Sequence, residues 1–292
     1  MRARRDRALR VAVATVVALA LGAGSASSAA ADERIVALTP FTANTLAQLG
    51  IVPVGIGQTL GGRDRLAPAL RGVRQLPLSH PNGPNLEQLA ALNAQLVFSS
   101  PTWQRGHAGM RRLGMRVVES EPRSVSAMIT ATRNIGRIVG REAQARQRAA
   151  AAQRRIAAAT RGIPRKKPRV LLLLGVGRTP YAFLENSWGG DVLRRAGARL
   201  LTGGLKANGG LARISNETVV KRNPDIIIAV PHATPENVPA LARYLRTNPA
   251  WRRTSAARNK RVYVSQDNSL LQAGTDVERT IRQVRTRYLR NG

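Results

Sequence analysis

Short apolar segments alternate with amphipathic segments along most of this chain. Strands are predicted at ERIVAL, GIVPVGIG, QLVFSS, MRVVES, RVLLLLG, NPDIIIAVP and KRVYVSQ. Helices are predicted at residues 43–49, at NLEQLAAL, at SVSAMITATRNIGRIVG, at REAQARQRAAAAQRRIAAATRG, at SWGGDVLRRAG and at DVERTIRQVRTRYLR. Strands that alternate with helices favour an α/β fold with largely parallel sheets.

An internal repeat indicates that this α/β pattern occurs twice. NLEQLAALNAQLVFSSP aligns without gaps on SNETVVKRNPDIIIAVP, so that Glu87 falls on Glu217 and Asn93 on Asn223. Each copy reads as a capped helix, a turn, a buried strand and a loop that begins with proline. We therefore expect two similar α/β lobes, with the alanine-rich helix near 141–161 as the single long helix that connects them. The predicted boundaries are 32–139 for the first lobe, 140–163 for the connecting helix and 164–292 for the second lobe.

The first 31 residues have the features of a cleaved export signal. MRARRDRALR is basic, VAVATVVALALGAG is apolar but short for a membrane span, and Ala29 and Ala31 match a small-residue cleavage motif. We expect an exported protein, periplasmic or otherwise extracytoplasmic. An uncleaved anchor is the alternative, and Arg4-Arg5 leaves the general and twin-arginine routes both open. The sequence contains no cysteine, so we expect neither disulfides nor a lipoprotein anchor.

The composition is that of a globular protein with a strong excess of positive charge. Of the 292 residues, 43% are hydrophobic, and 47 basic residues against 16 acidic ones give a net charge of +31. The basic residues read as scattered along the chain rather than grouped in a stripe. Such a chain attracts anions, including nucleic acid, anionic surfaces and carboxylate ligands. No nucleic-acid motif accompanies the charge, and the export signal disfavours a nucleic-acid partner.

The two copies of the repeat end at positions where α/β proteins bind ligands. Ligands lie beyond the carboxyl ends of the strands in open α/β sheets. Trp103 follows the strand of the first copy, and His232 follows the equivalent strand of the second. We expect both to face a ligand cleft between the lobes. The alternative for His232 is a loop histidine bonded to backbone, and position alone does not separate the two.

Several segments together resemble a known family. They are RIVALTP, GPNLEQLAALNAQLV, SWGGDVLRRAG, ISNETVVKRNPDIII and NPAWRRTSAARNKRVYVSQ, together with the signal peptide and the midchain helix. In order and spacing, they look like the substrate-binding proteins of ABC importers that carry haem, ferric siderophores or cobalamin. The resemblance implies two lobes joined by one rigid helix, a monomer, and a partner importer with a permease dimer and cytoplasmic ATPases.

Among these receptors the chain is most similar to those for haem. The resemblance implies that His232, in PHATPENVPAL, is an axial ligand of the iron. The methionine that these receptors place in the first lobe corresponds here to Asn82. The second ligand could therefore be His80, His107 or no protein group, and a siderophore or cobalamin also suits the missing methionine. Haem or another iron or cobalt chelate would be transported cargo, and we expect no cofactor of the protein's own.

Other side chains suit a porphyrin with carboxylate groups. Arg178, in GVGRTPY, follows a buried strand and could pair with a carboxylate. Trp103, Tyr181 and Trp188 could pack on the macrocycle, although Tyr181 and Trp188 could equally belong to the lobe core. We expect Trp251 to have a structural role.

An exported enzyme is the main alternative of another class. The sequence has no P-loop, H-E-x-x-H or G-x-S-x-G motif, and GVGRTP lacks the third glycine of a dinucleotide fingerprint. We therefore expect a binding protein that is not an enzyme. Glu87 and Glu217 are either acidic residues that complement a helix dipole or, as the resemblance implies, docking residues for the two permease subunits.

Overall fold

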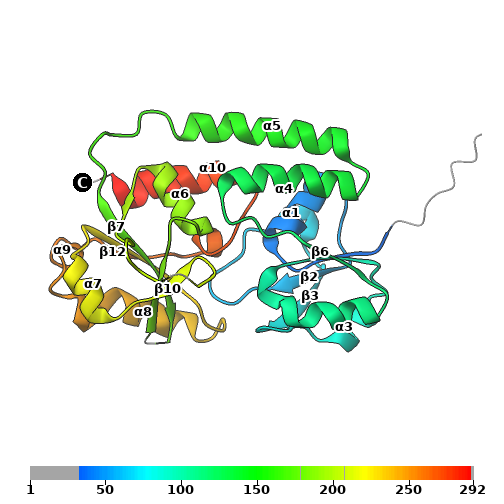
Figure 1. Ribbon diagram of the computed structural model, residues 1–292, viewed down its shortest axis with the longest axis horizontal. Helices are drawn as coiled ribbons and strands as arrows, with labels where there is room; N and C mark the ends of the chain where they lie inside the picture. The colour runs from blue at the N-terminus through cyan, green and yellow to red at the C-terminus, as the bar shows by residue number, and fades with distance from the viewer. Residues whose placement is uncertain (1–32, 178, 207, 291–292) are drawn as a thin grey trace, which may run out of the picture. The chain divides into compact units, whose positions relative to one another are not determined.

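The computed structural model describes residues 33–177, 179–206 and 208–290, so the predicted signal peptide lies outside the described residues. The first sheet has the strand order β4-β3-β2-β1-β5-β6, and all its neighbours pair in parallel except β3 and β4. Its strands are β1 (Ile35–Ala37), β2 (Gly55–Gln58), β3 (Arg74–Ser79), β4 (Gly83–Pro84), β5 (Leu96–Ser99) and β6 (Arg116–Glu119). Its helices are α1 (Pro40–Gln48), α2 (Leu86–Ala90) and α3 (His107–Arg112) (Figure 1).

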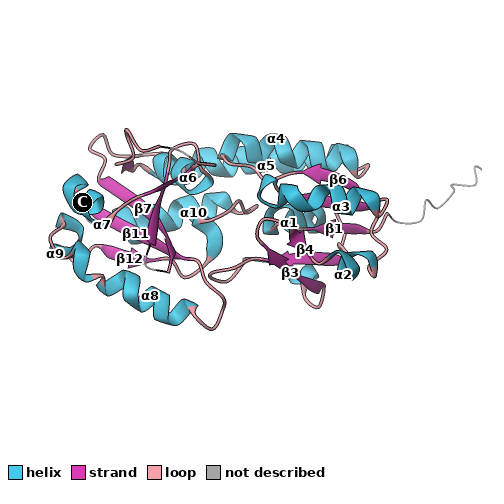
Figure 2. Cartoon of the chain, turned by 60° about the horizontal axis from the view of Figure 1, so that its bottom comes forward, coloured by secondary structure: helices cyan, strands magenta, loops and turns pink. Residues whose placement is uncertain are grey.

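The second sheet has the order β10-β8-β7-β11-β12, with the short strand β9 also paired to β7. Its strands are β7 (Arg169–Val176), β8 (Thr179–Phe183), β9 (Arg199–Leu200), β10 (Leu211–Arg213), β11 (Ile226–Pro231) and β12 (Val262–Val264). Its helices are α6 (Trp188–Ala196), α7 (Asn216–Arg222), α8 (Val238–Thr247), α9 (Ser255–Arg258) and α10 (Val277–Gln283), which continues as a π-helical segment, Val284–Leu289 (Figure 2). The predicted α/β fold with two lobes is confirmed, and each lobe contains one sheet.

The repeat found in the sequence corresponds to equivalent elements of the two lobes. Asn85 caps α2, which precedes β5, and Ser215 caps α7, which precedes β11. The aligned Asn93 and Asn223 both adopt left-handed backbone conformations, with φ of 47° and 45°. Asparagine tolerates this conformation better than most residues, so it can end a helix and redirect the chain into the strand.

The predicted long connecting helix is present, and a second helix packs along it. Helix α4 (Val125–Ile138) begins beside the second lobe, where the backbone N–H of Val125 donates to Asp191 of α6 over 2.9 Å. Helix α5 (Glu142–Ala159) then runs along α4 and also contacts α10 (Figure 1). The buried residues of α5 recur at intervals of four and three: Ala145, Ala149, Ala152, Ile156 and Ala159. This spacing gives a small-residue seam on which α4 packs closely. The predicted domain boundaries stay a prediction.

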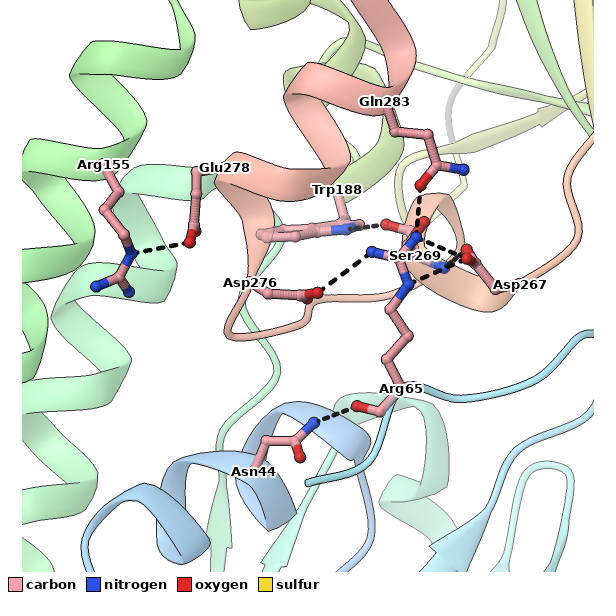
Figure 3. A network of polar contacts seen from close by, with 9 residues as sticks. All are labelled: Asn44, Arg65, Arg155, Trp188, Asp267, Ser269, Asp276, Glu278 and Gln283. Atoms are coloured by element: carbon pink, nitrogen blue, oxygen red, sulfur yellow. Dashed lines mark hydrogen bonds and ion pairs between the residues drawn. The ribbon is translucent and has the colours of Figure 1, made fainter. Parts of the chain in front are cut away.

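A polar segment after β2, residues 59–65, forms a second connection, which we call the interlobe strap. Buried Asn268 holds its middle, because the side-chain amide donates to the Gly62 carbonyl over 2.8 Å and accepts from the Gly62 N–H over 2.9 Å. Arg65 holds its end, because it pairs with Asp267 at 2.7 Å and with Asp276 at 3.2 Å (Figure 3). These partners lie about 200 residues further along the chain and belong to the second lobe.

Gly61 explains why the strap lies so close to the second lobe. Its φ is +102°, and a β-carbon there would stand 2.8 Å from the carbonyl oxygen of Pro231. Only glycine suits both the conformation and the close approach. Its N–H donates to the Ala233 carbonyl over 2.8 Å, so the strap is bound directly to the loop that carries His232.

Candidate functional site

A cavity of about 260 Å³ lies between the lobes and is lined by both. The first lobe and the strap contribute Gln58, Thr59, Leu60, Leu78, His80, Thr102, Trp103, Glu121, Pro122 and Arg123. The second lobe contributes Leu174, Phe183, Ser187, Trp188, Gly209, Leu211, His232, Leu271 and Gln272. Four of the residues predicted from the sequence, His80, Trp103, Trp188 and His232, therefore share one cavity. Arg178 lies outside the described residues, and Tyr181 is not part of this lining but packs against the core from β8.

His232 presents a neutral imidazole to the cavity. Its backbone N–H donates to the Gly175 carbonyl over 2.9 Å, which fixes the residue beyond the end of β11. The buried Nδ1 atom has no hydrogen-bond partner among the described residues. Burial, followed by the charge of nearby His80, lowers the pKa of His232. The ring therefore stays neutral at physiological pH and can offer a lone pair, as an axial ligand must.

His80 faces the same cavity from the other lobe. It lies in the loop after β3, its side chain is exposed, and it is close enough to His232 for the two charges to interact. The cavity therefore contains one imidazole from each lobe. Across the described residues, no group of three or more potential ligands could bind a bare metal ion. Two imidazoles suit instead a metal ion whose other coordination positions are occupied by a chelating ligand.

His107, the other candidate for a second ligand, has a different environment. It is 2% exposed and does not line the cavity. Its Nε2 atom lies 2.9 Å from Ser99 Oγ, and its Nδ1 atom lies 3.4 Å from Glu119 Oε1. Ser99, His107 and Glu119 are thus arranged like the catalytic triad of a hydrolase. Ser99 is completely buried, however, so its hydroxyl cannot reach a substrate. The contacts of His107 with Ser99 and Glu119 instead hold α3 against the sheet.

The two tryptophans form walls of the cavity but are anchored in the core. Trp103 is 8% exposed and packs in the core of the first lobe. Trp188 is 4% exposed, and its Nε1–H donates to the Ser269 carbonyl over 2.9 Å (Figure 3). Both can offer a ring edge or face to a ligand without moving. Trp251 is 1% exposed and bonds to Asn216, in agreement with a structural role.

The loop after β6 contributes two charged residues that the sequence analysis did not select. Arg123 and Glu121 line the cavity two positions apart. The hydroxyl of Ser100 donates to Glu121, and burial raises the pKa of this carboxyl group. The signal was present, because EPRS directly follows the predicted strand MRVVES at the ligand-binding edge of the sheet.

Glu87 and Glu217 occupy matching exposed positions at the starts of α2 and α7. The side chain of Asn85 accepts from the backbone N–H of Glu87, and that of Ser215 accepts from Thr218. A hydrogen bond with Ser215 lowers the pKa of Glu217, which therefore stays ionised. The geometry agrees with a favourable interaction with the helix dipole and leaves both carboxylates accessible.

Two α/β lobes that close on a cavity lined from both sides define a solute-binding receptor. The chain belongs to the periplasmic binding protein family, whose family model matches residues 35–268. The family and its fold neighbours are solute-binding proteins of transport systems and not enzymes. The family implies an extracytoplasmic location. No helix among the described residues has the length and apolar character needed to cross a membrane.

Relatives with known names support the family assignment. The chain is 26% identical over 201 residues to a "Cobalamin-binding protein" of Halobacterium salinarum, an alignment that covers 67% of this chain and 53% of the relative. It is 32% identical over 101 residues to "High-affinity heme uptake system protein IsdE" of Staphylococcus aureus, which covers 34% of each. The alignments thus span about half and about a third of these relatives.

Solved structures show the same fold. The structure of S. aureus IsdE complexed with heme matches with a TM-score of 0.70 and 24% identity, covering 87% of this chain and 98% of that one. An ABC transporter substrate-binding protein from Listeria monocytogenes matches with a TM-score of 0.71 and 24% identity, covering 86% and 98%.

Proposed function

We propose that this protein is an extracytoplasmic receptor that captures haem and delivers it to an ABC importer. The observation that carries the proposal is the imidazole of His232, kept neutral by its lowered pKa, which lines the same cavity as His80 from the other lobe. Support also comes from the names of relatives, one of which takes up heme and another of which binds cobalamin.

The cavity residues suit the chemistry of haem. His232 from one lobe and His80 from the other would ligate the iron on its two faces. Arg123 would pair with a propionate, because guanidinium groups bind carboxylates with two parallel hydrogen bonds. Arg178 remains a second candidate for that role. Trp103 and Trp188 would provide apolar contact with the macrocycle.

The size of the cavity indicates that the ligand must widen it. Pockets for ligands of this class measure roughly 300–1,000 Å³, whereas the present cavity measures about 260 Å³. His80 is exposed and is the ligating candidate most able to move, while His232 is held by its backbone hydrogen bond. We therefore expect His232 to bind first and His80 to complete the complex.

A spectroscopic titration tests the cargo and its ligands. Purified protein titrated with haem should give a sharp Soret band that saturates at one equivalent. His232→Ala should shift this band and weaken binding at least about tenfold, because it removes the fixed axial ligand. His80→Ala should change the spectrum from a six-coordinate to a five-coordinate type with a smaller loss of affinity.

His107→Gln is the matched control, because it changes the third histidine of the chain outside the cavity. It should keep the wild-type spectrum even if it lowers the melting temperature. An unchanged free-haem spectrum with wild-type protein would instead favour the second candidate, a ferric siderophore or cobalamin. A His232→Ala variant with wild-type spectrum and affinity would refute the ligand assignment.

We further propose that Glu87 and Glu217 dock against arginines of two permease subunits. Their matching, exposed positions on the two lobes support this role. Exposed charge pairs act mainly on association rate and salt dependence. Replacing both with Gln should preserve folding and cargo affinity but reduce the stimulation of transporter ATPase activity in vesicles by at least about fivefold at limiting receptor.

The double variant Glu142→Gln with Glu185→Gln is the charge-matched control, because both of its glutamates are exposed and lie on other elements. It should stimulate the transporter like wild type. Full stimulation by the Glu87 and Glu217 double variant would leave these two residues as helix-capping carboxylates only.

A further inference from the structure

More than half of the net positive charge of the described residues lies in two segments. Segments 124–167 and 279–290 contain 16 basic residues and one acidic residue, a net charge of +15 in 56 residues. The other 200 described residues contain 25 basic and 13 acidic residues, a net charge of +12. The prediction that the charge is scattered is therefore wrong, because the net charge per residue is about fourfold higher in these segments than elsewhere.

The fold brings the two segments together. They form α4, α5, the linker that follows α5, and the C-terminal helix from Arg279 of α10 onward, and α5 contacts both α4 and α10 (Figure 1). A groove of about 360 Å³ joins the linker to the C-terminal helix, with Lys166, Arg282, Arg285 and Arg290 in its lining. We call this surface the basic face. It consists of Arg133, Arg137, Arg141, Arg146, Arg148, Arg154, Arg155, Arg161, Arg165, Lys166, Lys167, Arg279, Arg282, Arg285, Arg287 and Arg290.

Most of these cations are available to an external partner. Fifteen of the 16 are exposed, and Arg285 is partly buried. Within the described part of the chain, only Arg146 and Arg155 of this set form ion pairs, with Glu142 and Glu278. Crowded like charges repel one another and destabilise the folded state. Folding alone gives no reason for the arrangement, whereas binding to an anionic surface does.

We propose that the basic face binds the anionic phospholipid surface of a membrane. Helix α5 is about 27 Å long and contacts both α4 and α10, so the cations come from three neighbouring helices and not from a single one. Tyr288 is the single aromatic residue of the two segments, and it is 1% exposed. The face therefore lacks the stacking platforms with which proteins hold single-stranded nucleic acid.

Such binding would be peripheral and sensitive to salt. The basic face offers no exposed aromatic ring to insert among lipid tails, so attraction to lipid phosphates provides the affinity. Counterions screen this attraction within about 10 Å at 0.1 M salt. The proposal does not depend on haem, since none of these 16 residues lines the interlobe cavity.

Vesicle flotation with the full chain tests the proposal. Wild-type protein should float with phosphatidylcholine vesicles that contain about 30% phosphatidylglycerol and not with pure phosphatidylcholine vesicles. Binding should fall steeply between about 0.05 and about 0.3 M salt. Replacing five residues that have no side-chain hydrogen bond or ion pair in the described structure, Arg148, Arg154, Arg161, Lys166 and Arg282, with Gln should reduce the bound fraction at least about tenfold.

A control variant with the same net charge as the face variant distinguishes the effect of where the charge lies from the effect of the total charge. It replaces five exposed arginines elsewhere with Gln, namely Arg74, Arg111, Arg112, Arg243 and Arg246. This control should keep vesicle binding within about twofold of wild type. A further variant with lysine in place of Arg148, Arg154, Arg161 and Arg282 should bind vesicles like wild type. Thermal melting should show that every variant is folded.

Two results would overturn the proposal. Equal loss of vesicle binding in the face and control variants would mean that total charge, not the basic face, attracts lipid. A face variant that loses binding to double-stranded DNA but keeps vesicle binding would assign the surface to nucleic acid.

Discussion

The residues around the cavity differ in how firmly the fold holds them. His232 is fixed by a strand end and by the strap, Trp188 by a hydrogen bond to Ser269, and His80 by neither. The strap itself contains a partly buried carboxylate, Asp64, whose Oδ1 accepts from Asn268 over 2.9 Å and from Gln272 over 3.1 Å. Burial outweighs these hydrogen bonds and raises the pKa of Asp64.

The raised pKa makes the contribution of Asp64 to stability depend on pH. In the unfolded chain the carboxyl group ionises near 3.8, whereas in the folded protein it keeps its proton to higher pH. The free energy of unfolding therefore falls as pH rises through the interval between the two pKa values. Asp64→Asn keeps an oxygen acceptor without the charge, so it should match wild type in acid and exceed it by roughly 1 kcal/mol at pH 7.

Urea unfolding of both proteins across pH 4 to 7.5 measures this difference. Asp64→Ala is the contrasting variant, because it removes the acceptor of two amide groups, one of them on buried Asn268, and should cost about 1–3 kcal/mol. A constant difference between Asp64→Asn and wild type at all pH values would contradict the raised pKa.

Sequence reasoning identified the cavity residues that follow apolar strands and missed those defined by the fold. His232 and Trp103 follow strands that were visible as apolar segments, so their placement could be predicted. Gln272 lies in a loop with no pattern of its own, whereas Arg123 follows a predicted strand but was not selected. The strap was also missed, because pairs such as Arg65 and Asp267 are separated by about 200 residues and leave no local signal.

At the scale of elements, long helices were easier to predict than short strands. The helix predicted near 141–161 is α5, and its alanine content accounts for both its helical propensity and its close packing. The pairing of α4 with α5 was not predicted, since it depends on Gly136, where a β-carbon would lie 2.1 Å from the β-carbon of Ala145. Strands β9 and β10 have two and three residues and show no periodicity.

The small-residue seam of α5 should tolerate no increase in volume. Ala149 is completely buried against the core, so Ala149→Leu should destabilise the protein by about 1–3 kcal/mol through overpacking. Ala143→Leu is the matched control on the same helix, because Ala143 is exposed, and it should change stability by less than about 0.5 kcal/mol. Chemical denaturation measures both, and equal effects would show that α5 does not pack through this seam.

At the scale of the whole molecule, two connections limit the relative motion of the lobes. Helices α4 and α5 form one, and the strap with its Asn268 and Arg65 contacts forms the other. Packed helices bend less than the loop hinges that absorb large dihedral changes in other receptors. The lobes should therefore widen the cavity by a small movement and not by a large rotation.

Solution scattering with and without cargo tests this rigidity. The two profiles should nearly coincide, with radii of gyration that agree within about 1 Å, because the helical pair resists bending. Asn268→Ala should release the strap and increase the difference, since it removes three hydrogen bonds with residues 62 and 64. A large compaction of the wild-type protein on binding would contradict the two-connection description.

The strap also has a consequence for how the protein acquires its binding site. Contacts between residues so distant in sequence form late in folding, because the loop between them must close first. During synthesis, the strap is made about 200 residues before its partners Asp267 and Asn268. A chain that is still being synthesised could fold its first sheet, but it would lack the second wall of the cavity and the anchor of that strap. The complete cavity would thus form only after nearly all of the described chain has been synthesised, so the order of synthesis alone sets when the protein could first hold a ligand.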